Sequence, residues 1–218
     1  MRILDRLREQ HRLIEQVAGS LVAFADRARA VERPGEALES FCSFFDGYAD
    51  AHHHAMEENI LLRALRDAGL PETGPIAMIE AEHAGNREDI RKLRALGGSE
   101  QFDDPAFAAT ARQYCARLWE HIDKEDSVLF PEIETRLVLE REKLDREFDA
   151  AEKAGEGIAA LAELGASLVG RFPPRQELPG VIRGEGCTPC RHFGIGCQGV
   201  EREWWSDLEW ESFHSRDS

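Results

Sequence analysis

Apolar residues recur at intervals of three and four along most of the chain, as they do on the buried face of an α-helix. Proline and glycine interrupt this pattern at a few places, where helices usually end. The pattern predicts four long helices followed by two shorter amphipathic ones. The expected ranges are about 2–32, 36–69, 74–96, 104–138, 141–153 and 158–171. We therefore expect an all-α fold in which long helices pack side by side.

The breaks in the pattern divide the chain into four parts. Residues 1–140 hold the long helices and residues 141–171 hold the accessory helices. Residues 172–186 begin with Phe-Pro-Pro-Arg, which is typical of an extended linker. Residues 187–218 form a small appendage rich in Cys, His and Trp, which we expect to be irregular.

Composition and charge narrow the possible partners. The formal net charge is −15, from 42 acids against 27 bases, which argues against binding nucleic acid or an anionic membrane by bulk charge. The sequence has no apolar run near the roughly 18 residues that a membrane helix needs. Its charged N-terminus is unlike a signal peptide. A cytoplasmic location is therefore expected.

The sequence His-His-His-Ala-Met-Glu-Glu begins at residue 52 and contains two overlapping candidate metal-ligand pairs. These are His53 with Glu57 and His54 with Glu58. Residues four apart lie on one face of an α-helix, so each pair could bind one transition-metal ion. Helical phase places His53 and Glu57 on the apolar face, which makes them the preferred pair, with the register open by one residue.

A second copy of the spacing supports a metal site between helices. His121 and Glu125 repeat it in the fourth helix, and His11 and His83 each lie within an apolar stripe. Buried histidines with ordinary hydrogen-bond partners are the simpler explanation for any one of them. However, at 1.5 Å per residue all the candidates lie within roughly one helical turn of the same height. The candidate metal ligands are His11, His53, Glu57, His83, His121 and Glu125.

In the order and spacing of these motifs, the chain resembles the hemerythrin-like (HHE cation-binding) family over about residues 1–155. The resemblance implies an up-down-up-down four-helix bundle, to which this chain adds C-terminal helices and the Cys-rich tail. It also implies a non-haem di-iron centre, with two iron ions bridged by the carboxylates of Glu57 and Glu125. The motifs are His11, His53-x-x-x-Glu57 before Ile60-Leu61-Leu62, Glu82-His83, and His121-x-x-x-Glu125 before Val128-Leu129-Phe130-Pro131.

The chain departs from the oxygen-carrying members of that family in its third helix. These have a further histidine one turn before the helix-three ligand, where this chain has Ile79. The departure argues against simple reversible oxygen carriage and favours the wider family roles in iron, oxygen, nitric oxide or redox handling. Four side chains are alternates that could supply the missing ligand: His54, Glu58, Glu80 and Asp126.

Three functions are compatible with this ligand set. The first is a di-iron protein that binds or senses a small diatomic ligand (oxygen or nitric oxide) or redox state. The second is a di-iron enzyme acting on peroxide or nitric oxide, which is less favoured because the sequence shows no separate substrate pocket or acid–base pair. The third is a regulatory module whose metal state acts through the C-terminal tail on a protein partner. Similar ligands also accept manganese or zinc.

The cysteines of the tail suggest a second metal site. Cys187, Cys190, His192 and Cys197 have the residue types of a four-ligand zinc site. Three cysteines with a ligand from elsewhere could instead hold an iron–sulfur cluster. The alternative without metal is a Gly-rich loop that packs on the bundle through its aromatic residues. Cys42 and Cys115 lie in helices and are most simply small core residues.

Overall fold

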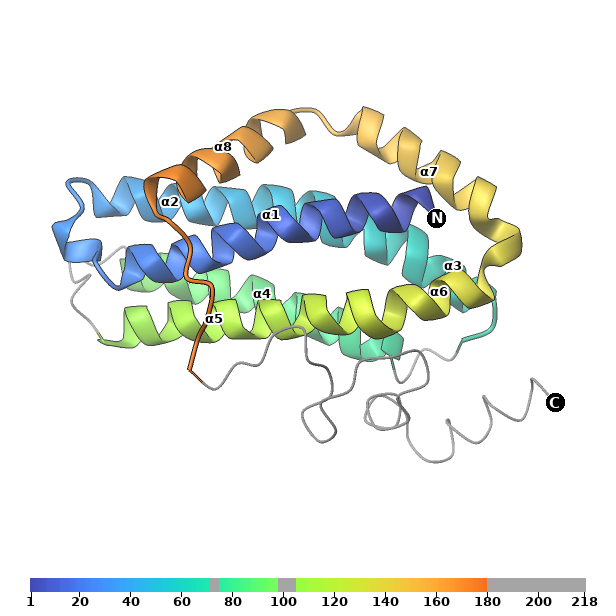
Figure 1. Ribbon diagram of the computed structural model, residues 1–218, viewed down its shortest axis with the longest axis horizontal. Coiled ribbons are helices and arrows are strands. Elements are labelled where there is room, and N and C mark those ends of the chain that lie inside the picture. The colour runs from blue at the N-terminus through green and yellow to red at the C-terminus, as the bar shows by residue number, and fades with distance from the viewer. Residues whose placement is uncertain (71–74, 98–104, 180–218) are drawn as a thin grey trace.

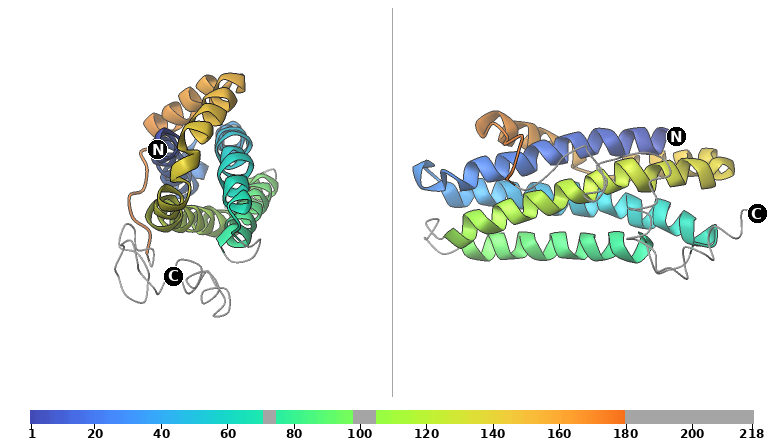
Figure 2. Two further views of the ribbon diagram at one scale, coloured as in Figure 1. Left: turned by 90° about the vertical axis from the view of Figure 1, so that its right-hand side faces the viewer. Right: turned by 60° about the horizontal axis from the view of Figure 1, so that its bottom comes forward.

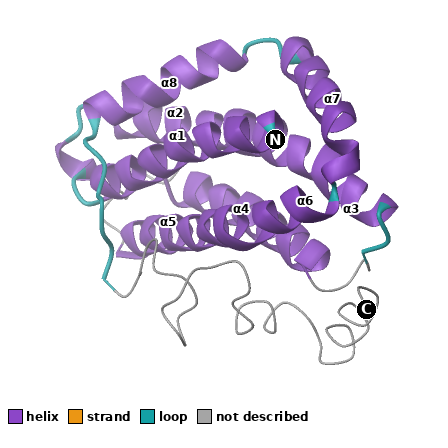
Figure 3. Cartoon of the chain, turned by 45° about the vertical axis from the view of Figure 1, so that its right-hand side comes forward, coloured by secondary structure: helices purple, strands orange, loops and turns teal. Residues whose placement is uncertain are grey.

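The computed structural model describes residues 1–70, 75–97 and 105–179. Within these ranges the chain forms helices and turns with no strand, which confirms the expected all-α fold (Figure 3). No helix in these ranges is both long enough and apolar enough to span a bilayer. The Cys-rich tail lies outside the described residues.

Four long helical segments lie side by side as a bundle (Figure 1). The first is α1 and the third is α4, whereas the second and fourth each contain π-helical stretches, η2, η3 and η4, between their α-helical parts. The first three bounds are α1 (Arg2–Ala25), α2 (Pro34–Phe44) and η2 (Phe45–His54). Next come η3 (Glu57–Leu62), α3 (Arg63–Asp67) and α4 (Pro75–Gly97). The fourth segment contains α5 (Pro105–Lys124), η4 (Glu125–Leu129) and α6 (Phe130–Arg136).

The first helix ends at Ala25, earlier than the expected end near residue 32. A short 3₁₀ turn, η1 (Ala28–Ala30), follows it, and Val31 is extended. Pro34 then occupies the first turn of α2, where its missing N–H costs no hydrogen bond. The residue before a proline avoids the α conformation, and Arg33 accordingly has φ −134° and ψ 73°. The break is therefore spread over several residues instead of one.

The accessory helices α7 (Arg141–Ala154) and α8 (Ile158–Arg171) follow a short 3₁₀ turn, η5 (Val138–Glu140). They lie on one side of the bundle, α7 over α1 and η3 and α8 over α1 and α2 (Figure 2). Gly165 lets α8 approach closely, since a Cβ there would lie 2.5 Å from the ring of Phe44. Gly157 has φ +81°, a conformation that favours glycine, in the turn between the two helices. Both accessory helices thus contribute to the core of the bundle.

The core consists of two apolar clusters separated by a layer of polar residues. One cluster includes Phe24, Phe41 and Phe107, and the other includes Leu7, Leu65 and Ile133. In each of the four long helical segments, the buried histidines and glutamates lie near the point where residues of one cluster give way to residues of the other. The candidate ligands therefore occupy the middle of the bundle.

Asp145 of α7 caps the first helix from a distance. Its carboxylate accepts a hydrogen bond of 3.0 Å from the backbone N–H of Ile3, in a buried position. We expect Asp145→Ala to lower the free energy of unfolding by about 1–2 kcal/mol, the usual cost of losing a helix cap. Urea unfolding measures this change. Asp149→Ala is the matched control, because its exposed ion pair with Arg2 should contribute less than about 1 kcal/mol. Equal losses in both variants would contradict the capping role.

Candidate metal centre

The π-helical stretches coincide with the candidate ligands. η2 ends at His54, η3 begins at Glu57 and η4 begins at Glu125. A π-helical turn holds more residues than an α-helical one and is frequent at functional sites. As a result, the consecutive residues His53 and His54 are both buried inside the bundle, at 1% and 3% exposed. The structure therefore brings in both histidines, where α-helical phase predicted that only one would face inward.

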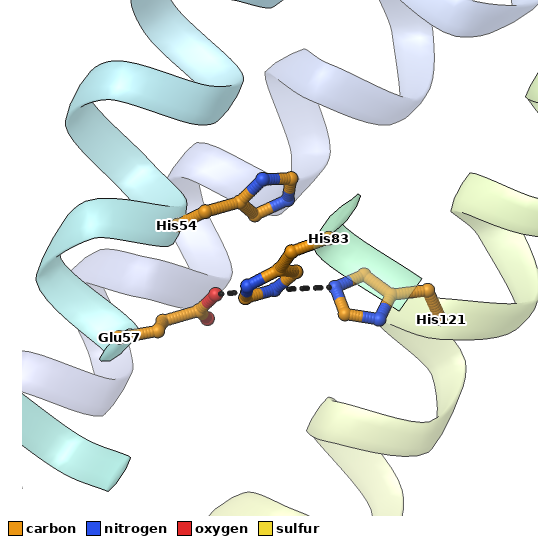
Figure 4. A group of neighbouring side chains, drawn as sticks. All are labelled: His54, Glu57, His83 and His121. Carbon is orange, nitrogen blue, oxygen red and sulfur yellow. Dashed lines mark hydrogen bonds and ion pairs between the residues drawn. The ribbon is translucent and has the colours of Figure 1, made fainter. Parts of the chain in front are cut away.

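Five of the six buried histidines of the described residues form two groups around shared carboxylates. The two-histidine group consists of His11 and His53, together with Glu57 and Glu125. The three-histidine group consists of His54, His83 and His121, together with Glu57 (Figure 4). Within each group the possible ligand atoms lie within 4.8 Å of one another. Side chains from all four long helical segments contribute to the two groups.

Glu57 lies between the two groups, with one oxygen toward each. Its Oε1 is 3.4 Å from His53 Nε2 and 3.8 Å from His11 Nε2. Its Oε2 is 3.6 Å from His83 Nε2. One carboxylate with its two oxygens facing different sets of imidazole nitrogens is suited to bridging two cations.

The two carboxylate oxygens of Glu125 also face different groups. Its Oε2 is 3.2 Å from His11 Nε2 in the two-histidine group. Its Oε1 is 3.4 Å from His121 Nε2 and 3.9 Å from His83 Nε2 in the three-histidine group. Glu125 thus directs one oxygen toward each group, as Glu57 does.

The fit of the site to a metal can be judged from its buried polar atoms that have no hydrogen-bond partner. Both oxygens of Glu57 and both of Glu125 are buried and have no hydrogen-bond partner among the described residues, and the same is true of His11 Nε2. Leaving a buried carboxylate unpaired is costly. All five atoms belong to one layer and are typical metal donors. Two cations would satisfy them, so the residues present fit a dinuclear metal site.

The outward ring nitrogen of each histidine faces an oxygen, which leaves Nε2 for the interior. Metal-binding histidines usually donate their other N–H to such an oxygen, which fixes the tautomer. Four of these contacts are hydrogen bonds of 2.8–3.0 Å, and the fifth, from His54 to Asp50, spans 3.5 Å. The partners are Asp126 for His11, Gln10 for His53, Glu58 for His83 and Glu82 for His121.

A second ring of charges holds these outer carboxylates in place. Arg87 donates to Asp50 at 2.6 Å and to Glu58 at 2.8 Å, so one guanidinium joins the partners of His54 and His83. Lys124 donates to Glu82, the partner of His121. The outer partners of the three-histidine group are therefore fixed by cations on α4 and α5.

Burial and crowding shift the pKa values of the inner groups in opposite directions. Burial, with the nearby charge of Glu125, raises the pKa of Glu57 well above its usual range. Burial alone would lower the pKa of His11, but the carboxylates of Asp126 and Glu125 raise it to about 10. Burial and the neighbouring histidines lower the pKa values of His53 and His54 well below the usual range. Without metal, protons on His11 and Glu57 therefore reduce the charge imbalance of the layer.

These shifts predict that metal binding releases protons. At neutral pH His11 carries a proton that must leave before Nε2 can bind a cation, and Glu57 must also ionise. The apparent affinity should therefore rise with pH between 6 and 8, by about tenfold per unit for each proton released. Calorimetric titration in buffers of different ionisation enthalpy counts the protons. An affinity that does not change with pH would contradict the prediction.

The stability of the metal-free protein should fall as the pH rises, whereas the metal affinity should increase. The folded-state pKa of His11 lies above its usual value of 6.5, so its contribution to stability is complete below pH 6.5. That contribution is lost as the pH rises toward about 10. Chemical unfolding of chelator-treated protein at several pH values measures this loss.

The other predicted residues lie outside the two groups or beyond the described residues. Glu58 and Asp126 bond the outer nitrogens of His83 and His11. Glu80 pairs with Arg66 at 2.5 Å and is not part of either group. Ile79 is fully buried in an apolar cluster. The second predicted metal site, at Cys187, Cys190, His192 and Cys197, lies outside the described residues and stays a prediction.

Sequence reasoning missed three outer partners. Gln10 precedes His11, Glu82 precedes His83, and Asp50 lies one turn before His54. Only the last has a recognisable signal, an acid four residues from a histidine. Cys42 and Cys115, which were expected in the core, are both buried, and burial raises the pKa of Cys42 to about 12.

Comparison with known proteins gives one match. Residues 2–133 match the family model described as "Hemerythrin HHE cation binding domain", which confirms the resemblance inferred from the motifs. The matched range contains all the histidines and glutamates of the two groups and ends within α6, so α7 and α8 lie beyond it. Searches of curated proteins and of solved structures gave no match.

Proposed function

Because the chain belongs to the hemerythrin HHE cation-binding family, we propose that its two histidine groups hold a pair of non-haem iron ions. We further propose that the protein binds or senses oxygen, nitric oxide or redox state. This proposal rests on the positions of the Glu57 and Glu125 carboxylates between the two groups. Each carboxylate directs one oxygen to each group, and none of the four oxygens has another partner among the described residues. This arrangement suits two neighbouring cations better than one.

The donor set supports iron. Imidazole nitrogen suits iron, and carboxylate oxygen offsets the charge of two close cations. When bound, such a pair of ions supplies reversible electron transfer and a place for a small ligand. Both groups face Glu57 and Glu125, and the two-histidine group has one histidine fewer, so the small ligand is expected on the side of His11 and His53.

The surroundings of the site favour a small ligand over a larger substrate. The histidines and glutamates of the two groups are at most 3% exposed, and apolar clusters lie on either side of them. Phe130 stacks on the ring of His11, at 5.5 Å between ring centroids. These side chains exclude bulk water and leave room for diatomic species more readily than for an organic substrate. This restriction favours oxygen, nitric oxide or peroxide over an organic substrate, and turnover separates binding or sensing from the enzymatic alternative.

Metal analysis and spectroscopy test the proposal. Protein expressed with ample iron should contain about two irons per chain. Its absorption in air should differ from its absorption under nitrogen, and nitric oxide should change the spectrum in proportion to the protein present. Protein without iron, or with only zinc or manganese after iron-replete expression, would refute it. Repeated turnover of peroxide or nitric oxide would instead support the di-iron enzyme.

A further inference from the structure

Gln10 is a buried polar side chain with both ends of its amide in use. It lies on α1 at 7% exposure, between two consecutive histidines of η2. Its Oε1 is 2.9 Å from His53 Nδ1, and its Nε2 is 3.4 Å from His52 Nε2. Only His53 of these two histidines belongs to a metal group. The amide therefore links a candidate ligand to a histidine that has no place in the metal layer.

The chemistry of these contacts fixes the direction of every hydrogen bond. His53 can bind a cation through Nε2 only if its proton is on Nδ1, and that N–H must then donate to Gln10 Oε1. The amide nitrogen of Gln10 can only donate, so His52 Nε2 must accept. If the amide turned over, its N–H groups would face His53 Nδ1 and favour the tautomer that blocks Nε2. When His52 carries its proton on Nδ1, the lone pair on Nε2 would then face the amide oxygen, and this opposes the turn.

His52 is itself held by the turn between the accessory helices. A Cβ on Gly155 would lie 3.6 Å from His52 Nδ1, so the backbone of this turn lies against the ring. Glu152, one turn earlier, accepts two hydrogen bonds of 2.9 Å from Arg6 of α1. The ring of Tyr48 lies 5.9 Å from that of His52. The α7–α8 turn lies beyond residues 2–133, the range of the family match.

We infer that Gln10 and His52 form a positioning pair that holds His53 in the tautomer able to bind the metal of the two-histidine group. This inference rests on the proposed metal site. The effect is confined to one group because the other histidines have different outer partners. His11, the second histidine of the same group, donates to Asp126. The accessory turn thereby supports one of the two metals through His52.

Substitution of Gln10 tests the pair. Gln10→Met keeps the length of the side chain and removes both hydrogen bonds. It should weaken the metal of the two-histidine group by about 10- to 100-fold, the usual effect of losing an outer partner, and change the other metal by less than about threefold. Gln10→Glu should stay within about threefold of the wild type, because a carboxylate still accepts from His53 Nδ1. Two-step titration with Co²⁺, followed by visible absorption, measures both affinities.

The tautomer itself provides a readout that does not need metal. In metal-free wild-type protein, ¹⁵N NMR of the histidine rings should show His53 protonated on Nδ1. Gln10→Met should give a mixture of tautomers, and Gln10→Glu should restore the single form. His52→Phe keeps a ring and removes the acceptor, so it should also give a mixture. Gln113→Met, on the exposed face of α5, is the matched control and should change neither affinity nor tautomer.

The outcomes separate the inference from the proposed function. A wild-type protein that takes up no pair of metals, with His53 in the expected tautomer, would refute the function and leave the positioning pair intact. Equal weakening of both metals by Gln10→Met would overturn the inference, as would an unchanged tautomer. So would a Gln10→Glu variant that behaves like Gln10→Met, or a His52→Phe variant identical to the wild type. Circular dichroism confirms that each variant is folded.

Discussion

Glu57→Gln is expected to abolish the binding of both metals at once. The glutamate lies between the two groups, so each metal loses an oxygen donor together with the negative charge that offsets it. Loss of an outer partner alone costs about 10- to 100-fold in affinity, and loss of a shared donor should exceed about 100-fold for each metal. Metal analysis after dialysis against a limiting iron concentration measures the effect.

The neighbouring Glu58→Gln is the matched comparison. Among the described residues, Glu58 bonds the outer nitrogen of His83 and the guanidinium of Arg87, so its loss should weaken mainly the three-histidine group, by about 10- to 100-fold. Glu57→Gln should fold about as well as the metal-free wild type, because glutamine keeps the size of the side chain and its lack of charge, and the Glu57 oxygens have no hydrogen-bond partner among the described residues. Retention of one metal by folded Glu57→Gln would show that Glu57 does not bridge.

His53→Ala and His54→Ala should deplete different metals, although the two residues are consecutive. His53 belongs to the two-histidine group, whereas His54 stacks on His83 at 3.9 Å between ring centroids, in the three-histidine group. Each variant should keep about one metal per chain. With Co²⁺ bound, the shifted NMR signals of coordinated histidines should come from His54, His83 and His121 in His53→Ala. They should come from His11 and His53 in His54→Ala.

The same pair of variants tests the role of the π-helical stretch. If η2 were an ordinary α-helix, adjacent side chains would point about 100° apart and only one could face the metals. One of the two substitutions would then leave both metals in place. Loss of the same metal in both variants would also contradict the assignment of the two histidines to separate groups.

Much of the fold and of the ligand set followed from local patterns. The helix breaks near Pro34, Gly69 and Gly97 could be predicted because proline and glycine act on their own turn. The six candidate ligands could be gathered because residues at equal distances from a loop lie at equal heights in a bundle. Each of the six lies within the two groups in the structure, although their role as metal ligands stays a prediction.

The remaining features of the site could not be predicted from the sequence, because they depend on contacts between distant parts of the chain. His54 was only an alternate, because its inward direction requires the π-helical geometry of η2 and not the α-helical spacing. His54 lies beside His83, where Ile79 provides no ligand; the sequence named it as one of four alternates for that place but could not choose among them. Gln10 and Glu82 act on histidines of other helices, so no sequence interval records them.

The polar layer in the middle of the bundle has a consequence for how the protein unfolds. It separates two apolar clusters, each of which includes residues from both ends of the chain. Without cations, the buried polar atoms that lack hydrogen-bond partners among the described residues make the midsection the weakest part of the bundle, and each half can open with little effect on the other. With cations bound, the four helices are joined at that level and must open together. Metal occupancy then sets the cooperativity of unfolding, and hydrogen exchange in one half reports on the other.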